Sequence, residues 1–216
     1  MSTGQNELRS TNVNHPSYRG TVKATRKVDT DNVILLLDRG IHIPSRTVFL
    51  AGEITRETVD ATIRGLLLLS HLSSEDSIRL VLNSDGGEVN QGLALMDVID
   101  SMPCEVVIDV VGEACSMAAI ILQSGDIRRL SSNARVMIHA GSEGYDENHA
   151  TIIKRWAKYQ AKEDKICTDK LLVRIRERHP GFTRQRLNRM MDFDTILTAT
   201  EAIELGLADE IISNGV

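Results

Sequence analysis

The stretch Gly112-Glu113-Ala114-Cys115-Ser116-Met117-Ala118-Ala119 joins two apolar runs, at 106–111 and 120–122. The first run is short and rich in β-branched residues, which predicts a buried strand, and the second predicts a helix. A nucleophile is favourably placed on such a turn, because the first N–H groups of the helix lack partners within it and favour negative charge. Small residues that pack at the start of a buried helix would explain the same stretch without any chemistry.

Strand and helix patterns alternate on both sides of this stretch. Strands are expected at 47–51, 78–82, 105–111, 127–130 and 135–139, and helices at 55–71 and from 89 to Pro103. A strand after each helix predicts an α/β fold with a parallel sheet. Further along, short helices are expected at 183–191 and 198–205, and a last strand at 209–212.

Two segments of the chain depart from this alternating pattern. Residues 1–32 are polar and show little periodicity, so we expect a flexible N-terminal arm before a folded domain at 33–216. In that domain, the apolar run 33–37 is followed by an expected turn at 38–40. A charged helix is expected at about 151–178, inside a projecting segment at 141–179. The helix is longer than a compact domain needs, and we expect it to pack on another subunit.

The composition excludes several classes of protein. The net charge is −5, which argues against a nucleic-acid binder. The three cysteines are far apart and form no cluster with histidine, so no disulfide framework, metal or cofactor is expected, and a reducing compartment fits best. No apolar run reaches membrane length and residues 1–20 lack a signal-peptide core, so we expect a cytoplasmic protein.

A serine becomes a useful nucleophile only with a base in reach and a third group that orients the base. His139 is the best candidate among six histidines, because it ends an apolar strand beside the start of the Ser116 helix. Asp192 and Asp194 are candidate orienting groups. A structural histidine and two helix-capping aspartates would account for the same three residues.

Acyl transfer also requires donors for the developing oxyanion, and backbone N–H groups are suitable. Gly86-Gly87 allows close approach of the backbone, and the N–H of Met117 directly follows the serine. The N–H groups of Gly87 and Met117 are therefore the candidate oxyanion donors. An ordinary turn at Gly86-Gly87 is the alternative.

Five stretches together resemble the family of the Clp protease proteolytic subunit, a self-compartmentalised serine peptidase with a crotonase-like fold of repeated βαβ units. They are Phe49-Leu50-Ala51-Gly52, Asn83-Ser84-Asp85-Gly86-Gly87, Ala114-Cys115-Ser116-Met117-Ala118, Arg135-Val136-Met137-Ile138-His139, and the block that starts at Asp194-Thr195-Ile196-Leu197. The resemblance extends from about residue 48 to 212, in the order of the family.

The resemblance implies roles for these residues. Ser116 would be the nucleophile, His139 the general base and Asp194 its orienting group, with Gly87 and Met117 as oxyanion donors. The implied activity is endopeptidase cleavage of unfolded proteins or peptides. The implied assembly is a homo-oligomeric heptameric ring, in some members stacked in pairs through a projecting handle helix, with an AAA+ ATPase unfoldase as partner.

The departures from the family pattern mainly affect the expected contacts between rings and with the ATPase. Family members commonly carry Asp-Arg-Asp where this chain has Asp192-Phe193-Asp194, so the arginine that joins two rings is missing. Aromatic positions that bind the apolar loop of the ATPase are here Arg79, Val81 and Ser101. Weak or absent binding of a conventional ATPase is therefore expected.

Three other functions are compatible with parts of the sequence. A crotonase-fold enzyme acting on coenzyme A thioesters would explain the glycines but leave the serine, histidine and aspartate as coincidence. A catalytically silent subunit of a mixed ring would retain the fold alone. A peptidase with a serine and a lysine requires a lysine near Ser116; none lies between Arg79 and Arg135, and one would have to approach from Lys154 or beyond.

Overall fold

The computed structural model describes residues 30–141 and 150–212. Helix α1 (Thr30–Arg39) leads into β1 (Ile41–His42), a short 3-10 turn, η1 (Ile43–Ser45), and β2 (Thr47–Ala51). Most of the predicted arm lies outside the described residues. The expected turn at 38–40 is wrong for its first two residues, which end α1. Asp31 in the first turn of α1 and Arg39 in its last both complement the helix dipole.

The other elements follow in the predicted alternation. They are α2 (Arg56–Leu72), β3 (Ile78–Ser84), α3 (Val89–Asp100), β4 (Val106–Cys115), α4 (Met117–Leu122), β5 (Ile127–Leu130), β6 (Arg135–Ile138), α5 (Ala150–Arg178), α6 (Arg184–Met191), β7 (Thr195–Thr198), α7 (Ala199–Leu205) and β8 (Glu210–Ile211). The predicted α/β class is confirmed. Strand β7 was not predicted from the sequence.

Strand β4 is the centre of the sheet. The main order is β1-β2-β3-β4-β5-β8, and β6 pairs with β4 outside this path and carries β7. The first half of β4 pairs with β5 and its last three residues pair with β6, in both cases parallel. Only β1/β2 and β6/β7 are antiparallel among the described strands. The sheet therefore divides along β4 and directs β6 and β7 to the end of that strand.

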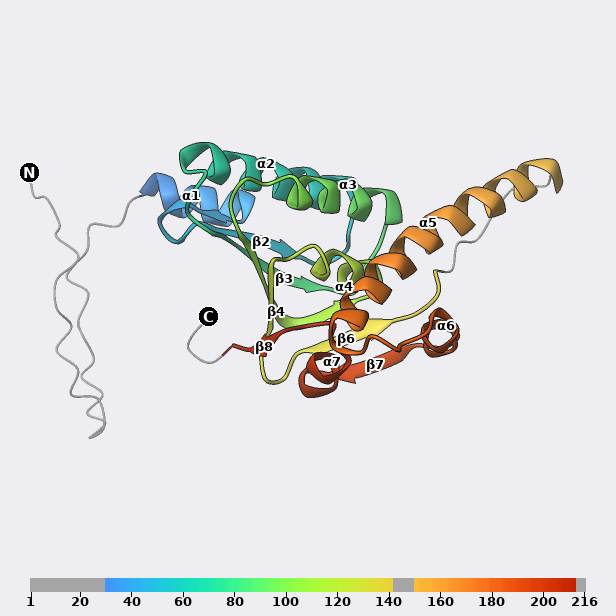
Figure 1. Cartoon of the computed structure of the whole chain (residues 1–216). Helices are drawn as coiled ribbons and strands as arrows, with labels where there is room; N and C mark the ends of the chain where they lie inside the picture. Colours follow the sequence, from blue (N-terminus) through green and yellow to red (C-terminus); the bar gives the residue numbers. More distant parts are fainter. Residues whose placement is uncertain (1–29, 142–149, 213–216) are drawn as a thin grey trace, which may run out of the picture.

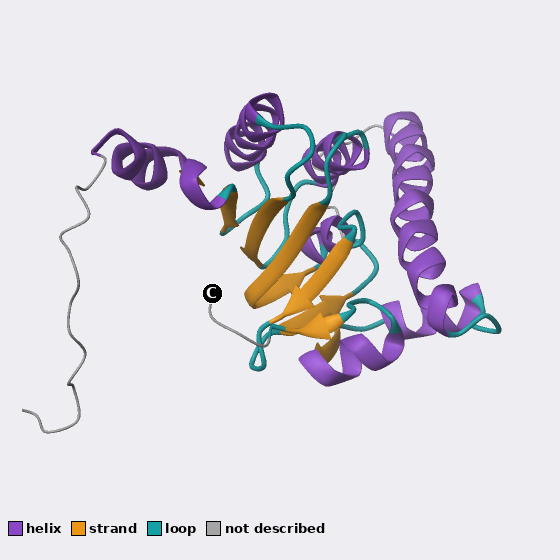
Figure 2. Ribbon diagram, turned by 60° about the vertical axis from the view of Figure 1, so that its left-hand side comes forward, coloured by secondary structure: helices purple, strands orange, loops and turns teal. Residues whose placement is uncertain are grey.

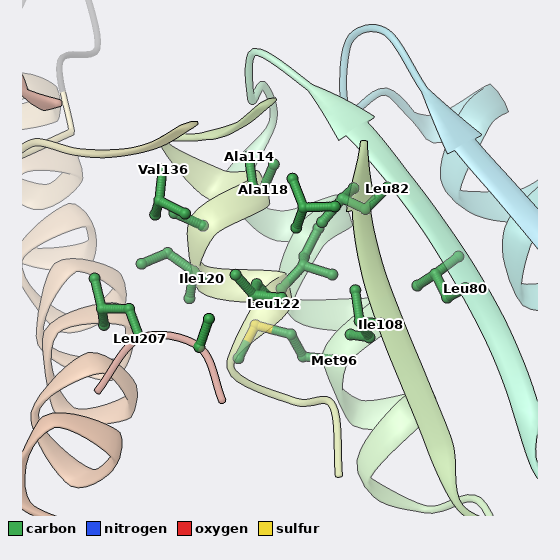
Figure 3. Packing of buried hydrophobic residues seen from close by; sticks show 14 of the residues in the cluster. Leu80, Leu82, Met96, Ile108, Ala114, Ala118, Ile120, Leu122, Val136 and Leu207 are labelled. Carbon is green, nitrogen blue, oxygen red and sulfur yellow. The ribbon is translucent and has the colours of Figure 1, made fainter. Parts of the chain in front are cut away.

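One face of the sheet forms the core. Leu80, Leu82 and Ile108 from β3 and β4 are fully buried, as are the α4 residues Ala118 and Leu122 (Figure 3). Aliphatic side chains and Met96 make up the part of the core that the figure shows, in a chain with only 3% aromatic residues. Helix α4 is buried along its whole length, which fixes the residue in front of it.

The opposite face of the sheet stays in contact with solvent in the described part of the chain. Phe49 is 40% exposed, and Arg79 and Arg129 reach this face from β3 and β5. Between them lies Asp109, which is completely buried and accepts hydrogen bonds from both guanidinium groups. Parallel sheets are usually covered on both faces, so an open face indicates contact with another chain.

Helix α5 extends away from the sheet at its N-terminal end (Figure 1), and Figure 2 shows it standing beside the strands. Its C-terminal part is anchored by the buried side chains of Leu171, Leu172 and Ile175. Trp156 and Ile166 are each 50% exposed. Among the described residues, no helix is both long and apolar enough to cross a membrane.

The turn around Ser116 is tighter than the sequence indicates. Strand β4 continues to Cys115, and α4 begins at Met117 rather than near residue 120. The strand is longer because its register with β3 shifts: Leu82 pairs with Val110, but Ser84 pairs with Ala114. The extra β4 residues at this bulge carry the strand to the residue just before the serine.

Candidate active site

The strand register brings three polar residues together. Cys115 of β4 pairs with Met137 of β6, so Ser116 lies beside the end of β6, where His139 follows. Ile138 of β6 pairs in turn with Thr195 of β7. Because this second pairing is antiparallel, the residue after Ile138 and the residue before Thr195 are His139 and Asp194, and they meet at one end of the sheet.

A chain of two hydrogen bonds links these side chains. His139 Nδ1 lies 3.0 Å from Asp194 Oδ1, and His139 Nε2 lies 2.8 Å from Ser116 Oγ. A carboxylate can only accept, so Nδ1 carries the proton, and in the neutral ring Nε2 accepts from the serine hydroxyl. This is the arrangement that lets a histidine remove a proton from a serine. Asp192, the other candidate orienting group, has no such bond to His139 in the described structure.

Ser116 has a backbone conformation that residues with side chains rarely adopt. Its φ is 53° and its ψ is −122°. Such a conformation persists only where the surroundings impose it, and it is common at functional sites. Here the N–H of Ser116 donates to Met137 O at 2.8 Å, and the buried helix α4 follows directly. The strain holds the hydroxyl out of the strand and toward His139.

The Gly86-Gly87 turn lies directly against the serine. A β-carbon at Gly86 would be 2.7 Å from Ser116 Cβ and 3.2 Å from the Met117 nitrogen. Ile54 donates to Gly86 O and accepts from the Glu88 N–H, so it bonds the residues on either side of Gly87. Because alternate residues of an extended chain direct their N–H groups to opposite sides, the Gly87 N–H points away from Ile54. The backbone is thus close enough for Gly87 and Met117 to act together.

Cys115 precedes Ser116 but is not a competing nucleophile. Burial, together with the neighbouring Glu113 carboxylate, raises the pKa of its thiol to about 11. Only about one thiol in a thousand would then be ionised at pH 8, and the thiolate is the reactive form. Glu113 is itself held by Arg135, whose side chain lowers the pKa of that carboxyl. Of these two neighbouring side chains, the serine is therefore the better candidate nucleophile.

A cavity of about 250 Å³ adjoins the serine and the histidine. Its lining comes from α3, α4, β6 and, across from them, α5 and α6. Thr168 of α5 and Asn188 of α6, which line this cavity, were not singled out in the sequence. The sequence of a charged helix does not show which of its faces lines a cavity. Within the described residues, no group of three or more histidine, cysteine or acidic side chains could hold a metal ion.

Two comparisons with known proteins identify the family of this chain. The family model described as Clp protease matches residues 39–215. The chain is 32% identical over 172 residues to a protein of Deinococcus radiodurans named ATP-dependent Clp protease proteolytic subunit. That alignment covers 79% of this chain and 81% of the Deinococcus protein.

Gly86→Ala tests the close contact between the glycine turn and the serine. Its φ of 108° and the 2.7 Å approach leave no room for a methyl group. We expect labelling of Ser116 by a fluorophosphonate probe to slow by about 100-fold, because small displacements at a reacting centre have effects of this size. Gly181→Ala is the control, since nothing lies within 4 Å of a β-carbon there. Equal labelling rates in both variants would contradict the contact.

Proposed function

The chain belongs to the Clp protease family, and on this premise we propose that Ser116, His139 and Asp194 form the catalytic triad of this serine peptidase. The observation that carries the proposal is the pair of hydrogen bonds from the serine through His139 to the aspartate. All three residues lie inside the segment that the family model matches. The substrates we propose are peptides and unfolded proteins.

The mechanism follows from the proton positions. Ser116 Oγ attacks the peptide carbonyl carbon while His139 Nε2 takes the hydroxyl proton. The carbonyl oxygen becomes negative and accepts from the N–H groups of Gly87 and Met117. His139 returns the proton to the amine as the peptide bond breaks, which leaves an acyl-enzyme. Water then attacks the ester, again with His139 as the base, and releases the acid and the free serine.

The alternatives explain fewer of the contacts. A coenzyme A thioester enzyme requires the oxyanion donors but gives no reason for the strained Ser116 to face His139. A silent subunit gives no reason for a complete hydrogen-bonded chain. A lysine base is disfavoured because none of the described residues that line the cavity is lysine. The serine peptidase accounts for all of these contacts at once.

The family places this peptidase in an oligomer, and we propose a homo-oligomeric ring of seven subunits. Exposed apolar side chains on two parts of the fold support contacts between copies. Phe193 and Ile196 flank the proposed triad aspartate and are 81% and 64% exposed, and helix α5 presents further apolar residues. Asp194 is itself 67% exposed, so water competes for its bond to His139 until another subunit covers this edge. Rings stacked in pairs would meet through these surfaces.

For the partner, we propose that an ATPase carrying a conventional apolar docking loop binds weakly. Arg79 stands where the family has an aromatic residue, and its guanidinium is engaged by the buried Asp109. Val81 is 7% exposed and offers little surface. The proposal places the assembly in the cytoplasm, in keeping with three free and buried cysteines.

Ser116→Ala tests the proposed nucleophile. We expect intact mass to show one fluorophosphonate adduct on the wild-type chain and none on the variant. Hydrolysis of a fluorogenic peptide should fall by about 10⁴-fold or more, as for other triad serines. Ser74→Ala removes an exposed serine that is distant from Ser116 in the sequence, and it should change neither the labelling nor the peptide hydrolysis. An adduct that persists on Ser116→Ala would sink the assignment.

Phe193→Ser tests the surface proposed to join subunits. Removal of an aromatic anchor from an interface typically weakens association by about tenfold or more. Sedimentation velocity at matched concentrations should therefore show smaller species for this variant, with peptide hydrolysis reduced in parallel. Leu72→Ser is the control, because it makes a similar change at an exposed position on α2. Unchanged sedimentation of Phe193→Ser would exclude this residue from the interface.

A pull-down tests the expected weakness of ATPase binding. A Clp ATPase with an intact apolar loop, immobilised in its ATP-bound form, should retain little of this protein. The Arg79→Tyr variant restores an aromatic side chain at the docking position and should be retained better. Tight capture of the wild-type chain would contradict the proposal, because it would show that Arg79 at the docking position does not weaken ATPase binding.

A further inference from the structure

The end of helix α6 offers two hydrogen-bond acceptors next to the proposed triad. The helix ends at Met191, and the last carbonyl groups of a helix have no partner within it. Met191 O accepts from the Ala140 N–H at 2.8 Å, and Met190 O accepts from the Thr195 hydroxyl at 2.5 Å. Ala140 directly follows the proposed base, and Thr195 directly follows its orienting group. Two successive carbonyls of one helix therefore hold the chain beside both groups.

Helix α6 is a firm support for these two bonds. Leu187 on its inner side is completely buried, and Met191 at its end is only 8% exposed. Arg184 in its first turn pairs with Asp169 of α5, and the Thr183 side chain caps its N-terminus. Packing and polar contacts thus fix the helix against the core, so its last carbonyls have a defined position.

The turn that carries Asp194 has little support of its own. Residues 192–194 are all exposed, and the Asp194 side chain is 67% exposed. In the described structure the hydrogen bond of its carboxylate goes to His139 Nδ1. Pairing with β6 begins only after the turn, at Thr195. The bond between Thr195 and Met190 joins the residues on either side of the turn, and it therefore closes the segment on which Asp194 lies.

We propose that Thr195 is a positioning residue of the triad. Its hydroxyl holds the 192–194 turn against the end of α6 and thereby keeps the Asp194 carboxylate in reach of His139. Without this bond the exposed turn opens, and the imidazole loses the group that orients it. The backbone bond of Ala140 supports the histidine in the same way from the other loop. This inference rests on the proposed function, because it concerns the geometry of the same site.

The test compares Thr195→Val with Thr195→Ser in hydrolysis of a fluorogenic peptide. Valine keeps the branched shape that suits a strand but removes the hydroxyl, whereas serine retains it. We expect kcat of Thr195→Val to fall by about tenfold or more, because small displacements of a catalytic group have large effects on rate. KM should stay the same, because Thr195 does not line the cavity. Serine should restore kcat, and equal losses in both variants overturn the inference.

A double variant shows whether Thr195 acts through Asp194. Residues that work through one interaction are not additive, so the second substitution costs little once the first has removed it. In an Asp194→Asn background, Thr195→Val should therefore leave the rate of fluorophosphonate labelling unchanged. A further loss there as large as in the wild-type background would overturn the inference, because the hydroxyl would then act on something other than the aspartate.

Thr183→Val is the matched control at the opposite end of the same helix. It removes the hydroxyl that accepts from the Arg186 N–H at 3.2 Å and so destabilises α6 away from the site. We expect its melting temperature to fall while its kcat stays at the wild-type value. An equal loss of kcat in Thr183→Val would mean that the stability of α6 alone explains the effect, and would overturn the inference.

The wild-type protein separates the two proposals. Wild-type protein that is labelled and active, together with an unchanged kcat in Thr195→Val, retains the serine peptidase and overturns only the positioning role. Wild-type protein that is neither labelled nor active on the peptide overturns the proposed function, and the role of Thr195 with it.

Discussion

The pairing of three strands at one end of the sheet is the constraint on which the site depends. Strand β4 holds β6 in parallel register, and β6 holds β7 in antiparallel register. A shift of one residue in either ladder would turn the side chains to the opposite face and move His139 away from Ser116 or Asp194. Backbone hydrogen bonds, and not contacts among the three side chains, therefore set the geometry. The side chains contribute two hydrogen bonds to a frame that already exists.

The same frame holds an unfavourable conformation. Ser116 has a positive φ, which costs of order 1–3 kcal/mol for a residue with a side chain. The buried helix after it and the hydrogen bond to Met137 leave no relaxed alternative. The fold tolerates this strain because α4 is entirely within the core, where repacking would cost more free energy than the strain at Ser116. The proposed nucleophile is therefore held between a strand and a fully buried helix, while Asp194 lies on an exposed edge.

The surfaces of the fold differ in the chemical character of their side chains. The core face is aliphatic, the open face carries the Arg79–Asp109–Arg129 cluster, and the cavity has both apolar and polar lining residues. A shared fold fixes where a site lies but not what it binds, because binding depends on the side chains presented there. The charged face and the lining of the cavity are where the preferences of this chain for partner and substrate are expected to differ from those of its relatives.

The sequence by itself determined the α/β class, most of the elements and the three candidate residues. Local patterns suffice for these, since apolar periodicity marks the strands and helices, and the short stretch around Ser116 is distinctive. The turn at 38–40 was misplaced because helix α1 continues to Arg39, and the limits of the serine turn were misplaced because the bulge in β4 depends on its pairing with β3. Strand β7 has only four residues, too few to show a pattern in the sequence, and it pairs with β6. Only the tertiary structure showed that Asp194, and not Asp192, lies within hydrogen-bond distance of His139 and that Thr168 and Asp164 line the cavity, because distances between residues far apart in the chain are set by packing and strand register.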